Sequence, residues 1–463
     1  MKSLFRLAVI AALAAPLPSF AQEAPSLTPD QRRTVDKLID RALADDTAWT
    51  VVESLTTEIG PRLGGSPQEA RARDWGAAKL KSLGFKNVRI ETYEMPYWER
   101  ISERAEIVSP FPQSLSVTAL GNSISTPEGG VTAEVVRFRT LPELQAAPMT
   151  GLEGKIVFVD EPMARTQNGS GYGTAVAKRS QAAVEAGKRG AAAAIIRSAG
   201  TDSHRNPHTG GASSASQPTA VPAGALSNPD ADQLARALKH AKGPVTLTLD
   251  LQTRREASVI SGNVIGEIPG KTDEVIVVGG HLDSWDLATG AIDDGAGIAI
   301  TTAAAKLVGG LSGKPKRTIR VVMWGAEEVG IYGGKAYAKA HEGELGKHVV
   351  AGESDFGAGR IYSFQTKFGE KSLAKAAPMA AALRRLAITP GDNNASGGAD
   401  VSDMSKAGVP VVTLAQDGTD YFDYHHTPDD TLDKIDPEAL RQNVAAWAAF
   451  LYMASEMEGG FRE

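Results

Sequence analysis

The sequence predicts an α/β fold, in which helices cover both faces of a mostly parallel mixed sheet and a smaller β-rich module is inserted. Three observations support this prediction. From about residue 263 to the end, strand-like apolar runs alternate with helical stretches, as in a parallel sheet. From about residue 108 to 250, Gly, Pro and Ser separate short apolar runs instead. The 463 residues are enough for two or three domains with a stable core.

The first 21 residues have the composition of a secretory signal. Lys2 and Arg6 precede the apolar stretch LAVIAALAAPL, and SFA at 19–21 supplies small residues for cleavage. The alternative is a membrane anchor, but the apolar run is shorter than the roughly 20 residues that a span requires. We therefore interpret residues 1–21 as a signal peptide and expect a secreted or periplasmic protein.

Three helices are expected in residues 22–107, the N-terminal part of the main domain. Thr28 and Pro29 are typical of the start of a helix, which would extend to about Asp45. A second helix covers TAWTVVESLTTEI and is broken by GPRLGGS. SPQE at 66–69 predicts a capping box that begins a third helix, ending at Gly84.

Residues 108–255 are assigned to the inserted β-rich module. Its short apolar runs are GKIVFVD, AAAAIIRS, PTAVPAGAL and PVTLTLDL. A polar loop in this module carries His204 and His208. From the loop sequence alone, both imidazoles are expected to be solvated.

Residues 256–463 continue the main domain and supply its central strands. The predicted strands are EVIVVGG, RTIRVVMWG, HVVAGES and PVVTLAQ. The predicted helices lie near GIAITTAAAKLV, GGKAYAKAHE, SLAKAAPMAAALRRLA and PEALRQNVAAWAAFLYMASEME. Ligand sites in such sheets lie beyond the carboxyl ends of the strands.

The composition limits the kinds of partner and metal site. A net charge of −6 without a basic run argues against nucleic acid as a partner. The chain has no cysteine, so any metal must be bound by His, Asp and Glu. Such ligands accept cobalt or manganese as well as zinc.

Candidate ligands follow each predicted strand of the main domain. In isolation each has a structural alternative: a histidine that closes a buried strand, a helix cap, a solvated helix start, or a surface histidine pair. Their shared position after successive strands argues against all of these alternatives at once, because those strand ends meet at one edge of the sheet. The candidates are His281, Asp283, Asp293, Asp294, Glu327, Glu328, Asp355, His425, His426 and Asp430.

This inventory fits two divalent cations that share a bridging carboxylate. Two such ions can polarise a carbonyl and activate a water molecule. Glu328 would bind metal, while Glu327 would take a proton from the water and pass it to the leaving amine. Asp283 and Asp430, placed two and four residues after His281 and His426, could accept the second ring N–H of each histidine.

The motifs HLDSWD, AIDDGAG, WGAEE, ESD and HHTPDDT, in this order, resemble those of the M28 family of dinuclear zinc peptidases. The stretches TTEIGPRLGGS, MPYWER, IIRS with PHTGG, and PKRTIRVVMWGAEE extend the similarity over essentially the whole mature chain. The resemblance implies a zinc-peptidase domain of the phosphorylase/hydrolase-like type with a protease-associated-like insertion. It also implies dipeptide substrates with free termini, and homodimers formed through noncatalytic parts.

The resemblance further implies a role for each motif residue. His281 and Asp355 would bind one zinc ion, Glu328 and His426 the other, and Asp293 would bridge them. Glu327 would be the general base and Asp283 the orienting acid. Asp294 would then be structural, His425 would line the pocket, and His208 could reach toward the substrate.

Two functions other than peptide hydrolysis use a similar fold or similar ligands. A noncatalytic scaffold of the same fold would lack ligands or the base, whereas all five ligands and Glu327 are present here. A single-zinc acyltransferase of the glutaminyl cyclase type uses similar ligands, but the similarity over the whole chain favours the peptidase.

Overall fold

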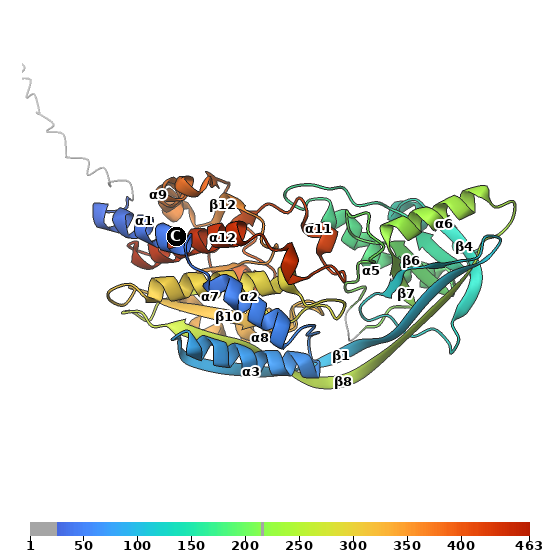
Figure 1. Ribbon diagram of the computed structural model, residues 1–463, viewed down its shortest axis with the longest axis horizontal. Helices are drawn as coiled ribbons and strands as arrows, with labels where there is room; N and C mark the ends of the chain where they lie inside the picture. Colours follow the sequence, from blue (N-terminus) through green and yellow to red (C-terminus); the bar gives the residue numbers. More distant parts are fainter. Residues whose placement is uncertain (1–25, 214–216) are drawn as a thin grey trace, which may run out of the picture.

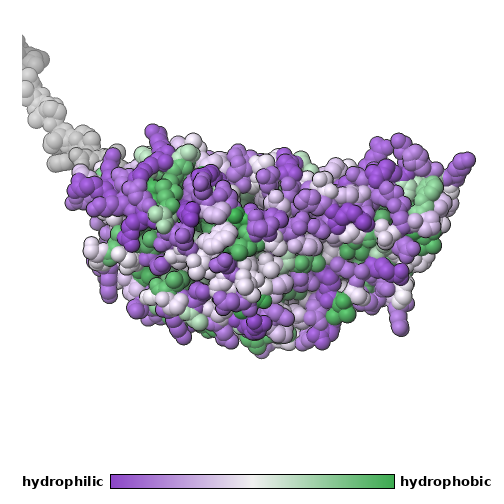
Figure 2. All heavy atoms as spheres, in the orientation of Figure 1, coloured by the Kyte–Doolittle hydropathy of each residue, from purple (hydrophilic) through white to green (hydrophobic). Residues whose placement is uncertain are grey.

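The computed structural model describes residues 26–213 and 217–463. The predicted signal peptide therefore lies outside the described residues. Within the described ranges, no helix is long and apolar enough to cross a membrane. The face shown in Figure 2 is mainly hydrophilic, with apolar residues in separate small areas.

The central sheet is mixed and mostly parallel, as the sequence predicts. Its strand order is β13-β12-β14-β11-β9-β10-β8. The central four strands are parallel, and β8 and β12 flank them in antiparallel orientation. The strands are β8 (Thr246–Ile268), β9 (Val275–His281), β10 (Thr318–Trp324), β11 (His348–Glu353), β12 (Ile361–Lys367), β13 (Thr389–Pro390) and β14 (Val411–Gln416).

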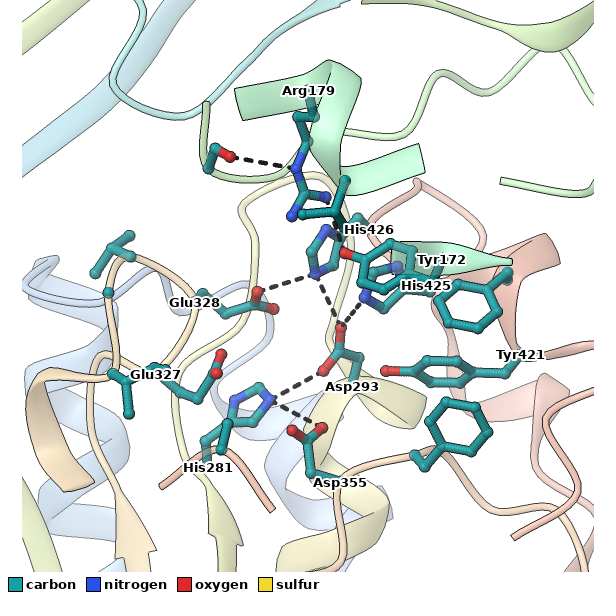
Figure 3. Close-up of a pocket in the computed structure, with 18 of the residues that line it drawn as sticks. Tyr172, Arg179, His281, Asp293, Glu327, Glu328, Asp355, Tyr421, His425 and His426 are labelled. Atoms are coloured by element: carbon teal, nitrogen blue, oxygen red, sulfur yellow. Dashed lines mark hydrogen bonds and ion pairs between the residues drawn. The ribbon is translucent and has the colours of Figure 1, made fainter. Parts of the chain in front are cut away.

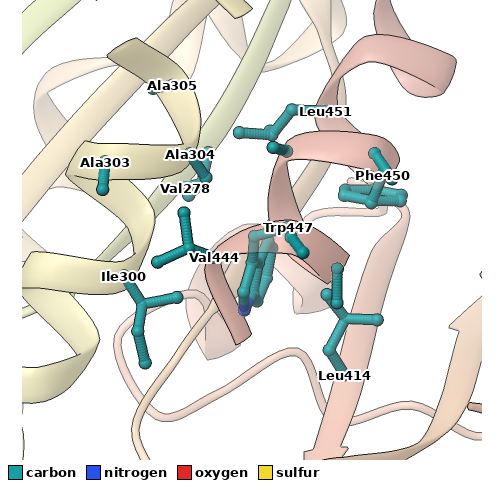
Figure 4. Packing of buried hydrophobic residues seen from close by; sticks show 14 of the residues in the cluster. Val278, Ile300, Ala303, Ala304, Ala305, Leu414, Val444, Trp447, Phe450 and Leu451 are labelled. Atoms are coloured by element: carbon teal, nitrogen blue, oxygen red, sulfur yellow. The ribbon is translucent and has the colours of Figure 1, made fainter. Parts of the chain in front are cut away.

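Helices cover both faces of this sheet because its strands are apolar on both sides. Val278 packs with Ile300 and Trp447 on one face (Figure 4), whereas Val277 packs with Trp324 and Tyr337 on the other. The first face is covered by α1 (Pro29–Ala42), α2 (Thr47–Glu58), α3 (Pro67–Ser82), α7 (Ala296–Gly309), α9 (Ala376–Leu383) and α12 (Pro437–Glu456). The second face is covered by α8 (Tyr332–Ala340) and α10 (Ser402–Lys406).

The N-terminal caps of the helices agree only in part with those predicted from the sequence. Thr28 and Gln31 form a complete capping box at α1. At α3, Ser66 accepts a hydrogen bond from the Glu69 amide, but the predicted capping box is incomplete. The Glu69 side chain is buried instead, and its Oε2 atom lies 3.3 Å from Nη1 of Arg73.

A long antiparallel ribbon links the two parts of the chain (Figure 1). It consists of β1 (Lys86–Ser109) and β8, and the sequence did not predict its length. Residues 254–258, in the middle of β8, are exposed and mostly polar, so they produce no apolar run that would mark a strand. In the middle of β1, by contrast, Met95, Tyr97 and Trp98 are buried. The remaining elements of residues 108–255 are β2 (Gln113–Leu115), β3 (Val117–Ala119), β4 (Val131–Phe138), α4 (Leu141–Ala146), β5 (Ile156–Val159), α5 (Tyr172–Lys188), β6 (Ala193–Arg197), β7 (Ala223–Leu226) and α6 (Asn228–His240).

Candidate active site

The parallel register of the central strands brings the candidate ligands together. His281 ends β9 opposite Trp324, the last residue of β10. Glu327 and Glu328, which follow β10, therefore lie just beyond the same edge of the sheet. Glu353 of β11 lies opposite Gly279, which places Asp355 at this edge too.

Asp293 lies between two groups of ligand atoms (Figure 3). Its Oδ1 is 2.9 Å from His281 Nε2, which is also 3.5 Å from Asp355 Oδ1. Its Oδ2 is 3.2 Å from His426 Nε2, which is 2.9 Å from Glu328 Oε2. Each oxygen of one carboxylate thus faces a different histidine–carboxylate pair.

The donor set fits divalent cations. Two triads have ligand atoms close enough to hold an ion: His281 with Asp293 and Asp355, and Asp293 with His425 and His426. Asp293 Oδ2 and Glu328 Oε1 are buried and accept no hydrogen bond from any described residue. Buried oxygens without donors are costly, and a cation would satisfy both.

The electrostatics of the site also favour cations. Burial and the charge of Asp293 together raise the pKa of Glu328 to about 7. Burial alone would also raise the pKa of Asp293, but the hydrogen bond with His281 and the nearby His426 ring hold it well below its usual range. Positive charge at this position is therefore stabilising.

His425 is the second histidine that faces Asp293. Its Nε2 is 3.4 Å from Asp293 Oδ2, and its ring stacks on that of His426 with centroids 3.5 Å apart. His425 therefore lines the cavity, where the sequence placed it. His426 itself has a left-handed φ of 63°.

Glu327 lies beside the ligands in Figure 3, with its carboxylate directed into the cavity. Burial raises its pKa well above the usual range, and the charges of Asp355 and Glu328 act in the same direction. A carboxylate with a raised pKa is suited to accept and release a proton during turnover.

Asp283 lies beside His281 and also holds a backbone segment of the site. The main-chain carbonyl of Asp283 is 3.0 Å from His281 Nδ1, whereas its Oδ1 is 3.7 Å away. The Asp283 carboxylate accepts hydrogen bonds from the amides of Glu327 and Glu328. It therefore fixes the position of this glutamate pair.

Asp430 does not orient His426, contrary to expectation. Its carboxylate accepts hydrogen bonds from the Ile292 and Asp293 amides, so it positions the central aspartate. The Nδ1 atom of His426 faces the Thr209 carbonyl at 3.3 Å instead. The Asp430 carboxylate therefore binds the turn before α7 rather than the His426 ring.

Asp294 has the structural role expected of it. Its two oxygens accept hydrogen bonds from the His281 and Gly297 amides, at 3.0 and 3.1 Å. It therefore caps the start of α7 and ties that helix to the end of β9. The peptide bond between Asp293 and Asp294 is cis.

Arg62, in the GPRLGGS stretch, is a supporting residue for which no individual role is predicted from the sequence. Its buried guanidinium donates to the carbonyls of Leu282, Thr289 and Gly290. These carbonyls flank His281 and Asp293. A buried arginine cannot be recognised from an isolated Arg in a loop sequence.

The loop with His204 and His208 corrects the expectation that both rings are solvated. His204 is half exposed and pairs with Asp429 at 2.9 Å. His208 is buried between Asp202 and the carbonyl of His425, to which its Nδ1 lies at 2.7 Å. Residues 108–255 therefore contact the backbone of the histidine pair.

The site opens into a cavity of about 540 Å³. Its walls come from both parts of the chain. The residues from 108–255 are Tyr172, Val176, Arg179, Gly211 and Ser213, none of which was predicted from sequence. They lie in α5 and in the loop that contains PHTGG, and only Gly211 belongs to a stretch quoted for the family resemblance.

Comparisons with known proteins identify the family. Residues 263–451 match the model of peptidase family M28. A solved structure of a peptidase M28 precursor from Shewanella amazonensis SB2B has a TM-score of 0.90 and 49% identity, covering 94% of this chain and 98% of that one. A zinc aminopeptidase from Bacillus subtilis shares the fold, with a TM-score of 0.67 and 20% identity over 90% of this chain and 97% of that one. Carboxypeptidase Q of Mus musculus is 34% identical over 87% of this chain and 84% of its own length. The chain therefore belongs to peptidase family M28 and is a metallo-exopeptidase.

Proposed function

We propose that this protein is a dinuclear zinc exopeptidase that hydrolyses dipeptides or removes terminal residues from short peptides. The observation that carries the proposal is the position of Asp293, whose two oxygens face two separate histidine–carboxylate pairs. A single-metal acyltransferase has no need for a carboxylate between two such pairs. The zinc aminopeptidase named above supports the choice of metal.

The proposed ligand set follows from the contacts. His281 and Asp355 would hold one ion, Glu328 and His426 the other, and Asp293 would bridge them. When bound, two zinc ions supply Lewis acidity, which polarises a peptide carbonyl and makes a water molecule more acidic.

Glu327 is the proposed general base. Its carboxylate would take a proton from the attacking water and transfer it to the nitrogen of the leaving amine, so that the peptide C–N bond breaks with balanced charge. Asp283 would keep Glu327 and Glu328 in place through their amides. The buried wall of the cavity would exclude bulk water from this transfer.

Three further features belong to this proposal. Residues 108–255 would form an inserted protease-associated-like domain between the two parts of the main domain, 22–107 and 256–463. Cleavage of the signal at 1–21 would release the protein to the periplasm or the exterior. The protein would form homodimers through its noncatalytic parts.

Glu327→Gln tests the proposed function. The variant should retain two zinc ions per chain and lose at least about 10²-fold in kcat on a dipeptide such as Ser-Met, because only proton transfer is removed. Glu344→Gln is a matched control, because Glu344 is an exposed glutamate outside the cavity. Near wild-type turnover of Glu327→Gln would refute the assignment. Cyclisation of an N-terminal glutamine peptide without dipeptide hydrolysis would favour the acyltransferase.

A further inference from the structure

Arg179 contributes a positive charge to an otherwise acidic cavity. It lies on α5 and is the one Arg or Lys among the described residues that line the cavity. The residue is only 8% exposed. In Figure 3 its guanidinium is directed toward the space that the labelled metal-ligand residues also face.

The guanidinium is bound only by neutral oxygens. It donates to the Gly211 carbonyl at 3.2 Å, to the Tyr172 hydroxyl at 2.9 Å and, weakly, to the Thr209 carbonyl at 3.4 Å. No carboxylate of a described residue forms an ion pair with it. By contrast, Arg189, at the end of the same helix, is buried but forms an ion pair: its Nη1 atom lies 2.6 Å from Oε2 of Glu185. Burying a charged group without an opposite charge is costly, so the environment of Arg179 lacks an anion.

The surrounding residues fix the orientation of the Arg179 guanidinium before any ligand binds. Gly210 has a φ of +130°, and a Cβ atom there would lie 2.1 Å from Nη1 of Arg179. Glycine thus allows the loop backbone to pack directly against the guanidinium. The ring of Tyr172 lies 5.5 Å from the guanidinium carbon. A guanidinium held in this way loses little conformational entropy when it binds a ligand.

The two ends of the cavity have opposite electrostatic character. Glu327, Glu328, Asp293 and Asp355 form one end, and Arg179 lies in the wall contributed by residues 108–255. An anionic group on a bound ligand would be attracted to Arg179. The neutral hydrogen bonds of Arg179 explain how the loop is held, but they do not explain why a permanent charge is buried there.

We propose that Arg179 is a specificity-determining residue that binds the C-terminal carboxylate of the peptide substrate. This inference rests on the proposed function. The carboxylate would bind the planar guanidinium through charge-assisted hydrogen bonds, the geometry that arginine provides best. The scissile carbonyl would then face the ligand residues, and the released amine would belong to the C-terminal residue. Arg179 therefore selects cleavage of the C-terminal peptide bond, in a dipeptide or in a longer peptide.

The test compares alanyl-phenylalanine with its C-terminal amide, which differs only by the lost negative charge. Hydrolysis is measured for the wild type, Arg179→Gln, Arg179→Lys and Lys188→Gln. The last variant removes a positive charge from the same helix outside the cavity. Binding of both ligands is measured by calorimetry on zinc-loaded Glu327→Gln, with and without Arg179→Gln, so that affinity is read without turnover.

The wild type and Lys188→Gln should prefer the acid over the amide by roughly 10²-fold in kcat/KM. Arg179→Gln should reduce this preference to within about threefold, and Arg179→Lys should restore part of it. A merely structural role would lower the values for acid and amide equally and leave their ratio unchanged, which would overturn the proposal. Equal affinities of the two ligands for Glu327→Gln would also overturn it, whether or not the protein hydrolyses peptides. Failure of the wild type to hydrolyse either peptide, with the acid still bound more tightly through Arg179, would count against the proposed function alone.

Discussion

Replacing Arg62 by Met should destabilise the protein and disturb the metal site together. The guanidinium donates to three backbone carbonyls distant in sequence, those of Leu282, Thr289 and Gly290, and to the nearby Gly60 carbonyl. Hydrogen bonds from a charged donor contribute about 1.5–3 kcal/mol each. The removed guanidinium no longer has to be desolvated, which offsets part of that loss. Leaving buried carbonyls without a donor costs about 1–3 kcal/mol each, so we expect a net loss of about 3–5 kcal/mol.

The assay is urea unfolding of the protein in a chelator, so that metal binding does not contribute to the measured stability. Zinc content after dialysis is measured separately. Arg71→Met is the matched control, because Arg71 is a nearby surface arginine with a single hydrogen bond to the Glu58 carbonyl. It should change the free energy of unfolding by less than about 0.5 kcal/mol. A loss below about 1 kcal/mol for Arg62→Met, or unchanged zinc content, would refute the reasoning.

Two further predictions concern the bridge and the acid stability. Asp293→Ala should lose bound zinc as well as activity, because one carboxylate faces both ligand pairs; full zinc occupancy in a metal assay would exclude the bridging role. His348, bonded to Tyr337 and the Glu344 carbonyl, is neutral at pH 7 because burial lowers its pKa to about 4. The contribution of the neutral His348 ring to the free energy of unfolding is fully present above the unfolded pKa of about 6.5. It falls by about 3 kcal/mol as the pH decreases toward 4. The unfolding free energy of His348→Asn should therefore depend less on pH over this interval, and an identical dependence in both proteins would show that another group controls it.

The parts of the structure that the sequence predicts are those whose signal is apolar periodicity or local capping. The buried runs of β9, β10, β11 and β14 were recognised as strands, and their common edge explains why the ligand candidates converge. The full length of the β1–β8 ribbon is not predicted, because the middle of β8 is exposed and mostly polar and its pairing partner β1 is distant in sequence. Pairing of this kind depends on a distant partner and leaves no periodic apolar pattern.

The supporting contacts of the site were harder to predict than the candidate ligands. Asp430 has the offset of a residue that could orient His426, but it binds the amides of Ile292 and Asp293. Sequence spacing indicates which side chains can reach a group, whereas backbone donors compete for the same carboxylate. The prediction that His208 lies in solvent fails for a related reason, because one of its partners, the His425 carbonyl, lies more than 200 residues away in sequence.

These contacts make the histidine pair depend on both parts of the chain. The Thr209 amide donates to the His426 carbonyl at 3.0 Å, while the Thr209 carbonyl faces His426 Nδ1. A neutral His426 that binds a cation through Nε2 must carry its proton on Nδ1, where this carbonyl can accept it. Residues 108–255 would thus set the tautomer of a candidate ligand through Thr209 and, in the same short loop, hold Arg179 through the Gly211 carbonyl. A displacement of this loop should therefore weaken metal binding and substrate selection together.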